Sequence, residues 1–175
     1  YQANGQYVSD FLRVGLWNGT SFASLPYLNL TDYYAYSIDV YKGNLFLGIG
    51  RNYSGLYELV NTTWVPLSNT KYVYDMISYN DTLYFGGDGN FRTYTASGGL
   101  GDEILLPDSA SNHYWKGSVA SLDTINNALW VAGNFRKYDV TTNQQVTSSP
   151  YDIARKYSNH KWSNRYIQHN ASGGA

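Results

Sequence analysis

Three copies of one pattern constrain the fold of this chain more than any other feature of its sequence. The copies occupy 37–50, 75–89 and 121–135. Laid over one another without a gap, they align two sets of apolar residues: Ile38, Met76 and Leu122, then Leu45, Leu83 and Leu129. Each copy is an apolar-rich run, a short turn and a second apolar run that ends in small residues. This order is typical of a β-hairpin, since residues such as Asn, Asp and Gly tolerate the backbone of a tight turn.

The second run of each copy is apolar on both faces. Its leucines alternate with the aromatic residues Phe46, Tyr84 and Trp130. A strand of this kind is expected between two sheets rather than on one side of a core. Recurrence of the unit after 38 and then 46 residues, in short strands, predicts the blades of a β-propeller.

The predicted fold is therefore all-β, one propeller region over 1–175 with four-stranded antiparallel blades, about three and a half of them visible. A partial blade covers about 1–30, and complete blades cover about 31–70, 71–110 and 111–170. The partial blade has only two outer strands, 11–17 and 21–25, because 11–25 match 151–165 at a constant offset of 140. The strands expected in the complete blades are 34–41, 45–49, 55–60 and 63–67, then 72–79, 83–87, 91–95 and 103–106, then 114–125, 129–133, 151–157 and 161–167. Flanking blades of a larger protein, another subunit, or pairing of the two chain ends in a four-bladed disc are expected to complete the partial blade, because an open strand edge invites aggregation.

Charge and composition narrow the classes of partner. Charged residues make up 14% of the chain and the net charge is −1, so the sequence has no basic footprint for nucleic acid. No run approaches the ~18 apolar residues of a membrane span, so we expect no membrane insertion in this segment. The absence of cysteine excludes disulfides and thiolate metal sites. Without an initiator methionine or a signal-peptide pattern, the chain is expected to be a processed protein or a piece of a larger one.

A family resemblance rests on the hairpin ends LYFGG and LWVAGNF and on the segments RVGLWNGTSF and IARKYSNHKW that follow polar loops. These motifs resemble the kelch-like repeats of secreted propellers, both bacterial or archaeal surface propellers and fungal cortical-marker-type surface glycoproteins. The resemblance implies a glycosylated propeller at the cell surface or outside the cell, used for binding or assembly.

N-glycosylation is also predicted from the residues themselves. Six Asn-X-Ser/Thr acceptor sites, none with proline in the middle, begin at Asn18, Asn29, Asn52, Asn61, Asn80 and Asn170. All six fall in predicted turns or loops, where a transferase can reach them. Asn-Gly and Asn-Asp turns beside threonine-rich strands also create such sites without any function, so this alternative stays open.

The sequence predicts no catalytic residues, no cofactor and no metal site, and hence not an enzyme. The three histidines, His113, His160 and His169, have no partner at a metal-ligand spacing. The carboxylates Asp39, Asp75 and Asp123 fall at similar repeat positions on inner strands. A recurring position favours a structural role, such as accepting hydrogen bonds from backbone donors.

Tyrosines form the candidate binding face. They cluster just before or within the innermost strands, at Tyr33, Tyr34, Tyr36, Tyr72, Tyr74 and Tyr114. Gathered on one face, they would offer an apolar surface that can also hydrogen-bond, suited to sugars or to a protein. Ordinary packing between blades is the alternative for about half of them.

Two functions of different classes follow. The first is a non-catalytic module of a glycosylated surface protein that acts in assembly, contacting other protein subunits or flanking blades in a sheath, filament or surface layer. The second is recognition of a carbohydrate or protein ligand through the tyrosine face. A third alternative is the propeller domain of a secreted enzyme whose catalytic part lies outside this segment.

Overall fold

The computed structural model describes residues 2–3, 6–7, 14–25, 33–51, 55–68, 72–108, 112–146, 151–158, 161–162 and 167–170. This part of the chain is all-β, and its strands pair antiparallel. It contains no helix, and hence no helix with the length and apolarity needed to cross a membrane.

The strands form four sheets in chain order, preceded by a small hairpin of β1 (Gln2–Ala3) and β2 (Gln6–Tyr7). Sheet I contains β3 (Gly15–Trp17) and β4 (Phe22–Ser24). Sheet II contains, in spatial order, β5 (Tyr33–Tyr41), β6 (Asn44–Arg51), β7 (Gly55–Val60) and β8 (Thr63–Pro66). Sheet III contains β9 (Asp75–Tyr79), β10 (Thr82–Gly87), β11 (Asn90–Thr95) and β12 (Gly99–Glu103). Sheet IV contains β13 (Leu106–Asp108), β14 (His113–Ile125), β15 (Ala128–Asp139), β16 (Tyr151–Ser158), β17 (Lys161–Trp162) and β18 (Ile167–Asn170).

The first two long strands of sheets II, III and IV are joined by the same tight turn. Its two residues are Lys42-Gly43, Asn80-Asp81 and Asn126-Asn127, and all six have positive φ, between 47° and 82°. This backbone matches the right-handed twist of the flanking strands, and asparagine, aspartate and glycine adopt it most readily. The predicted hairpins are confirmed, although each turn is one residue shorter than expected because Asn44, Thr82 and Ala128 already pair in the second strand.

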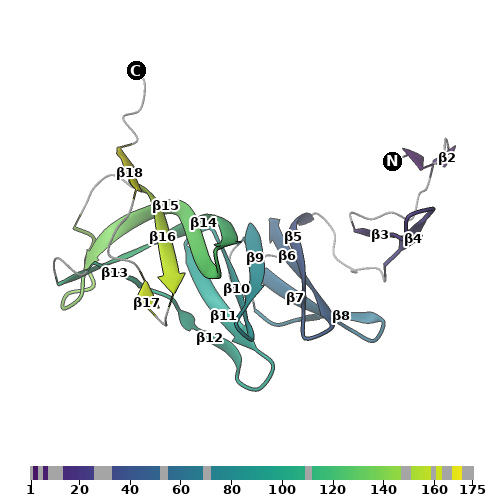
Figure 1. Cartoon of the computed structure of the whole chain (residues 1–175), viewed down its shortest axis with the longest axis horizontal. Coiled ribbons are helices and arrows are strands. Elements are labelled where there is room, and N and C mark those ends of the chain that lie inside the picture. Colours follow the sequence, from purple (N-terminus) through teal and green to yellow (C-terminus); the bar gives the residue numbers. More distant parts are fainter. Residues whose placement is uncertain are drawn as a thin grey trace.

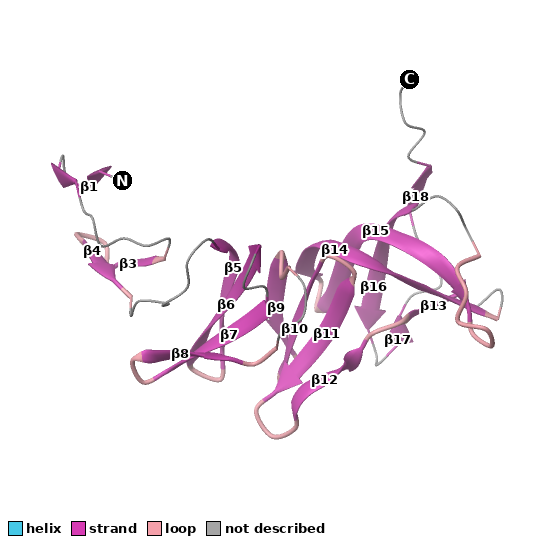
Figure 2. Ribbon diagram, turned by 180° about the vertical axis from the view of Figure 1, so that it is seen from behind, coloured by secondary structure: helices cyan, strands magenta, loops and turns pink. Residues whose placement is uncertain are grey.

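The sheets follow one another along the long axis of the molecule, with sheet I and sheet IV at opposite ends (Figure 1). Figure 2 shows the same succession from behind. Val14 and Leu25, which flank the two strands of sheet I, pack against a buried cluster of sheet II that consists of Leu47, Ile49, Tyr57 and Trp64. Sheet III lies between sheets II and IV and shares a buried cluster with each of them.

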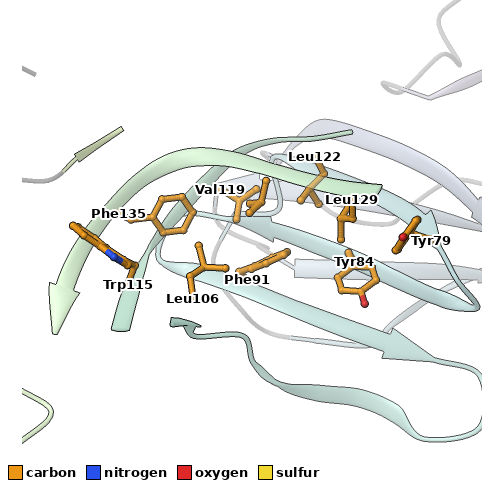
Figure 3. Packing of buried hydrophobic residues seen from close by; sticks show 10 residues of the cluster. Tyr79, Tyr84, Phe91, Leu106, Trp115, Val119, Leu122, Leu129 and Phe135 are labelled. Atoms are coloured by element: carbon orange, nitrogen blue, oxygen red, sulfur yellow. The ribbon is translucent and has the colours of Figure 1, made fainter. Parts of the chain in front are cut away.

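Two larger apolar clusters fill the spaces on either side of sheet III. Between sheets II and III the buried residues are Tyr41, Phe46, Leu56, Val73, Met76, Leu83 and Phe85. Between sheets III and IV they are Tyr79, Tyr84, Phe91, Leu106, Trp115, Val119, Leu122, Leu129, Val131 and Phe135 (Figure 3). These clusters account for the strands that are apolar on both faces.

The repeated leucines and aromatics point to opposite sides of their sheets, as the two-residue period of a strand requires. Leu83 and Leu129 are fully buried against the preceding sheet, whereas Leu45 is only partly buried, beside the sheet II cluster of Leu47, Ile49, Tyr57 and Trp64. Phe46 and Tyr84 face the following sheet. The repeat in the sequence is thus a repeat of inter-sheet contacts.

The expected strands are present, with differences in their extent and pairing. β9 begins at Asp75, three residues after the expected start at 72. Gly99-Leu100-Gly101, expected in a loose connection, belongs to β12, whereas 103–106 was expected to form that strand. The strand that follows, β13, pairs with β14 and so joins sheet IV. β15 continues to Asp139, past the expected end at 133, because β14 pairs with it along almost its whole length. β18 pairs with β16 where the end of a strand and a loop were expected.

Candidate binding surface

Four of the six predicted binding tyrosines come together at the ends of sheets II and III. Tyr34 and Tyr36 lie on β5, and Tyr72 and Tyr74 lie on the segment that leads into β9. The ring centroid of Tyr36 lies 6.2 Å from that of Tyr34, 6.0 Å from that of Tyr72 and 5.2 Å from that of Tyr74. Tyr34 and Tyr36 are 47% and 44% exposed, and Tyr72 and Tyr74 are half-buried beneath them. We call these four residues the tyrosine cluster.

A backbone irregularity and a glycine position the cluster. The pairing of β5 with β6 shifts register between Ala35 and Ser37, so that Tyr36 is the extra residue of a β-bulge. Bulges re-aim a side chain, here toward the next sheet. On β6, a Cβ at Gly50 would lie 2.1 Å from Tyr72 Cδ1 and 2.6 Å from Tyr36 Cε2. Only glycine lets these two rings lie so close to the backbone of β6.

Arg51 adds a positive charge to the edge of the cluster. Its Nη1 donates to the Tyr34 hydroxyl at 3.1 Å, and its guanidinium carbon lies 5.1 Å from the centroid of the same ring. The pKa of the Tyr74 hydroxyl is raised, mainly by burial and further by the negative charge of Asp88. The cluster therefore presents hydroxyl groups and one cation beside aromatic rings, a combination that can stack on an apolar surface and hydrogen-bond at the same time.

The other two predicted tyrosines do not join the cluster. The side chain of Tyr33 lies outside the described residues. Tyr114 is buried in β14 and stacks on Tyr138, with 5.6 Å between ring centroids and 14° between ring planes. Its hydroxyl donates to Asn143 Oδ1. The alternative of ordinary packing therefore describes Tyr114.

The tight turns lie at the ends of the inner strands away from the tyrosine cluster. There, a tyrosine beside the turn of one sheet hydrogen-bonds to the turn of the next sheet. The hydroxyl of Tyr41 donates to the carbonyl of Asp81 at 2.7 Å, and that of Tyr79 donates to the carbonyl of Asn127 at 2.9 Å. Lys42 also forms an ion pair with Asp81, and this bond raises the pKa of the lysine. The equivalent of the two tyrosines in sheet IV is Ile125, which is 49% exposed.

Two of the repeated aspartates bridge neighbouring sheets through backbone donors. Asp39 accepts from the N–H of its own following residue and, at 2.7 Å, from the N–H of Ser78 in sheet III. Asp75 makes the same pair of bonds, reaching the N–H of Leu122 in sheet IV at 2.7 Å. In the alignment of the repeats, Asp75 lies two residues earlier than Asp39. Its partner Leu122 likewise lies two residues earlier in the repeat than Ser78, the partner of Asp39. Both carboxylates hold inner strands side by side, a bond that charge strengthens.

Asp123 repeats only half of this arrangement. Its Oδ1 accepts from the N–H of Thr124 at 2.7 Å. Its Oδ2 has no hydrogen-bond partner in the part of the chain that the structure describes. Because Asp123 aligns with Asp39, this oxygen corresponds to the one that reaches the following sheet.

No cluster of three His, Asp or Glu side chains suited to a metal ion occurs among the residues the structure describes. His113 begins β14, where its Nε2 lies 3.9 Å from Asp139 Oδ2. His160 lies outside the described residues, as does the side chain of His169.

Three of the six glycosylation sites can be placed. Asn18, Asn61 and Asn80 are exposed in the turns β3–β4, β7–β8 and β9–β10. Asn61 and Asn80 have φ of 56° and 47°, and Asn18 Oδ1 accepts from the N–H groups of Thr20 and Ser21. Asn29 and Asn52 lie outside the described residues, as does the side chain of Asn170 in β18.

The sequence analysis did not single out the face of sheet IV that points away from sheet III as a candidate site. Asp123 pairs directly with Trp130 across β14 and β15, so the two share a face, as Asp39 and Phe46 do in sheet II. Trp130 is half-buried, and its Nε1 is buried without an acceptor among the described residues. The signal was present, because Trp130 aligns with Phe46 and Tyr84, which both cover the following sheet.

Comparison of the chain with protein-family models, with curated proteins and with solved structures finds no match to any of the three.

Proposed function

We propose that the chain is a non-catalytic β-propeller module of a secreted, glycosylated surface protein and that it acts through contacts with other protein units. The sheets would be its blades, with β5, β9 and β14 as the inner strands. The repeated contacts from sheet to sheet support this arrangement, because blades of a propeller pack face to face in chain order. The exposed acceptor sites Asn18, Asn61 and Asn80 support a glycosylated protein.

The observation that carries the proposal is the difference between the middle and the ends of the stack of sheets. Sheet III is covered on both faces, whereas the end sheets keep large apolar side chains in water, among them Trp17 at 50% and Ile125 at 49% exposure. Apolar residues left open on faces that neighbouring repeats cover elsewhere are typical of surfaces that bind protein.

Sedimentation velocity of the purified chain over a wide concentration range tests the proposal. We expect the mass to rise with concentration, because protein units that cover the end faces remove apolar surface from water. A compact monomer at every concentration would contradict assembly through the ends.

Secretion from a glycosylating host gives a separate measurement, in which we expect an intact mass above the 19.7 kDa of the polypeptide.

The tyrosine cluster favours a second function, recognition of carbohydrate. Two exposed rings over two half-buried ones, with Arg51 beside them, offer stacking and hydrogen bonding to a sugar. A glycan array probed with the wild-type chain and with Tyr36→Ala tests it. Binding that the substitution abolishes supports this function, and wild-type chain that binds no glycan excludes it for the sugars on the array.

A further inference from the structure

The tyrosine cluster continues into polar groups on sheets III and IV. The carboxylate of Asp88, in the turn between β10 and β11, lies close enough to Tyr74 for its charge to raise the pKa of that hydroxyl. Asp88 Oδ1 accepts from the hydroxyl of Ser118 on β14 at 3.4 Å, and Ser118 Oγ accepts from the N–H of Gly89 at 3.1 Å. Rings, carboxylate and hydroxyl therefore follow one another across sheets II, III and IV.

Sheet IV carries small side chains where sheets II and III carry rings. Extended toward the start of each inner strand, the alignment of the repeats places Ala120 at the position of Tyr36 and Tyr74, and Ser118 at that of Tyr34 and Tyr72. The backbone is equivalent as well, because Ala120 is the extra residue of a β-bulge in β14, as Tyr36 is in β5. Ala120 is exposed, and Ser118 and Asp88 are partly exposed. A methyl group, a hydroxyl and a carboxylate thus take the place of further rings.

The chain segment that carries the half-buried rings is anchored to the turn that carries Asp88. Asn90 Nδ2 donates to the carbonyl of Tyr72 at 3.2 Å. A Cβ at Gly87 would lie 1.8 Å from the same carbonyl oxygen and 3.0 Å from the backbone nitrogen of Tyr74, so only glycine permits this approach. A ligand that contacts both rings and carboxylate has less to order on binding when the two are already held together.

We propose that the tyrosine cluster, Asp88, Ser118 and Ala120 together bind a neutral oligosaccharide, with one sugar stacked on Tyr36 and a hydroxyl of a neighbouring sugar donating to Asp88. We call these residues the tyrosine–aspartate row. This inference rests on the second proposed function, recognition of carbohydrate, and names its class of ligand.

The chemistry of the row favours a neutral sugar chain. The apolar C–H face of a sugar ring suits the exposed ring of Tyr36, and sugar hydroxyls supply the donors that an ionised carboxylate, which only accepts, requires. A hydrogen bond to an ionised acceptor is also the stronger kind. A uronic acid would instead bring a second carboxylate to Asp88, and like charges placed opposite one another in a contact repel.

The test measures binding of paired probes to the whole chain by isothermal titration calorimetry. The probes are oligomers of glucose, galactose and mannose and the corresponding oligomers of their uronic acids. The wild-type chain should bind a neutral oligomer at least about 10-fold more tightly than its acidic counterpart. Asp88→Ala, which removes the charged acceptor, should weaken binding of the neutral oligomer at least about 10-fold.

Asp88→Asn separates a direct contact from a structural role. The amide keeps the size of the side chain and removes its charge, so the preference for neutral over acidic oligomers should disappear. A residue that only supports the turn would not set this preference. Asp123→Asn is the matched control, because it removes a carboxylate near the opposite end of the same strand, and it should bind like the wild-type chain.

Ala120→Tyr tests the place of the ligand. It gives sheet IV the ring that the repeat has in sheets II and III, at an exposed position, and should block the neutral oligomer. Binding that this folded variant keeps or strengthens overturns the row. Far-ultraviolet circular dichroism and the melting temperature report whether each variant is folded.

The possible failures are distinguishable. Binding of neutral oligomers that Tyr36→Ala abolishes, but that keeps its strength in Asp88→Ala and its preference in Asp88→Asn, overturns the row and leaves recognition of carbohydrate standing. A wild-type chain that binds acidic oligomers as tightly as neutral ones, or more tightly, overturns the proposed class of ligand alone. A wild-type chain that binds no oligomer of either class overturns both.

Discussion

Sheets II and III are built from the same repeat, yet the same position has opposite surroundings in the two. Ile38 of β5 is 49% exposed, whereas its equivalent Met76 of β9 is 6% exposed. Met76 is covered by the inner hairpin of sheet II. Ile38 instead lines a pocket of about 230 Å³, together with Leu47 and with Val14, the residue before β3. An apolar residue in a repeat is buried by the neighbouring unit and not by its own.

Sheet IV lies beside sheet III at the end of the stack opposite sheet I (Figure 1). Leu122, at the position of Ile38 and Met76, is 6% exposed because sheet III covers it. The residues on the outer side of sheet IV lack the contacts that Asp75 and Tyr79 make in sheet III. Burial, hydrogen bonding and hence stability should therefore depend on how many neighbouring sheets a position has.

The largest difference is expected at the repeated leucine. Leu83→Ala should lower the free energy of unfolding by ~2–5 kcal/mol, because a fully buried side chain leaves a cavity between sheets II and III. Leu45→Ala, at the equivalent but partly buried position, should cost only ~1–2 kcal/mol. Urea denaturation measures both values. Equal losses would contradict this difference in burial and show that Leu45 is protected as fully as Leu83.

The second-largest difference in the free energy of unfolding is expected between Asp75, which bridges two sheets, and Asp123, which makes only a local bond. Asp75→Ala removes the acceptor for the N–H of Leu122 across the sheet boundary, which should cost ~1.5–3 kcal/mol. Asp123→Ala removes only a local bond in an exposed position and should stay within about 0.5 kcal/mol. Hydrogen exchange of the Leu122 amide supplies a direct readout, with faster exchange in Asp75→Ala alone. Unchanged exchange there would contradict the bridge.

A smaller effect is expected from the hydroxyl that links adjacent turns. Tyr79→Phe keeps the ring and removes the bond to the carbonyl of Asn127, at a cost of ~0.5–1.5 kcal/mol. Tyr138→Phe is the matched control, because the structure gives its hydroxyl no hydrogen bond to any described residue. Thermal unfolding of the two variants in parallel should separate them, and identical melting temperatures would show that the turn link contributes nothing.

The last prediction concerns a pH dependence of stability that is absent at neutral pH and develops only at alkaline pH. Burial, followed by the neighbouring Tyr157, raises the pKa of Tyr84 to about 12. Between pH 10 and pH 12 the unfolded chain loses this proton and the folded chain keeps it, so stability should fall across that window. Below pH 10 both states hold the proton and the group contributes no pH dependence. Absorbance titration of phenolate in wild type and Tyr84→Phe measures the pKa, and a Tyr84 that titrates near 10 would contradict burial between sheets III and IV.

The sequence by itself determined the hairpins and their order. Asn80-Asp81 and Asn126-Asn127 belong to the residue types that most readily adopt positive φ, and alternating leucines and aromatics favour cover on both faces. These are local properties of the backbone and of neighbouring residues. They therefore predicted the all-β fold, the two-faced strands and the tyrosines that enter the inner strands.

Only the tertiary structure decided which faces are covered and which side chains meet. Nothing in the local pattern separates Ile38 from Met76, or Tyr114 in the core from Tyr36 on the surface. The bulge that turns Tyr36 toward Tyr74, and the pairing of β13 with sheet IV, depend on partners far along the chain. Burial and hydrogen bonding are properties of pairs of segments, so a repeat that is uniform in sequence becomes unequal once its units have different neighbours.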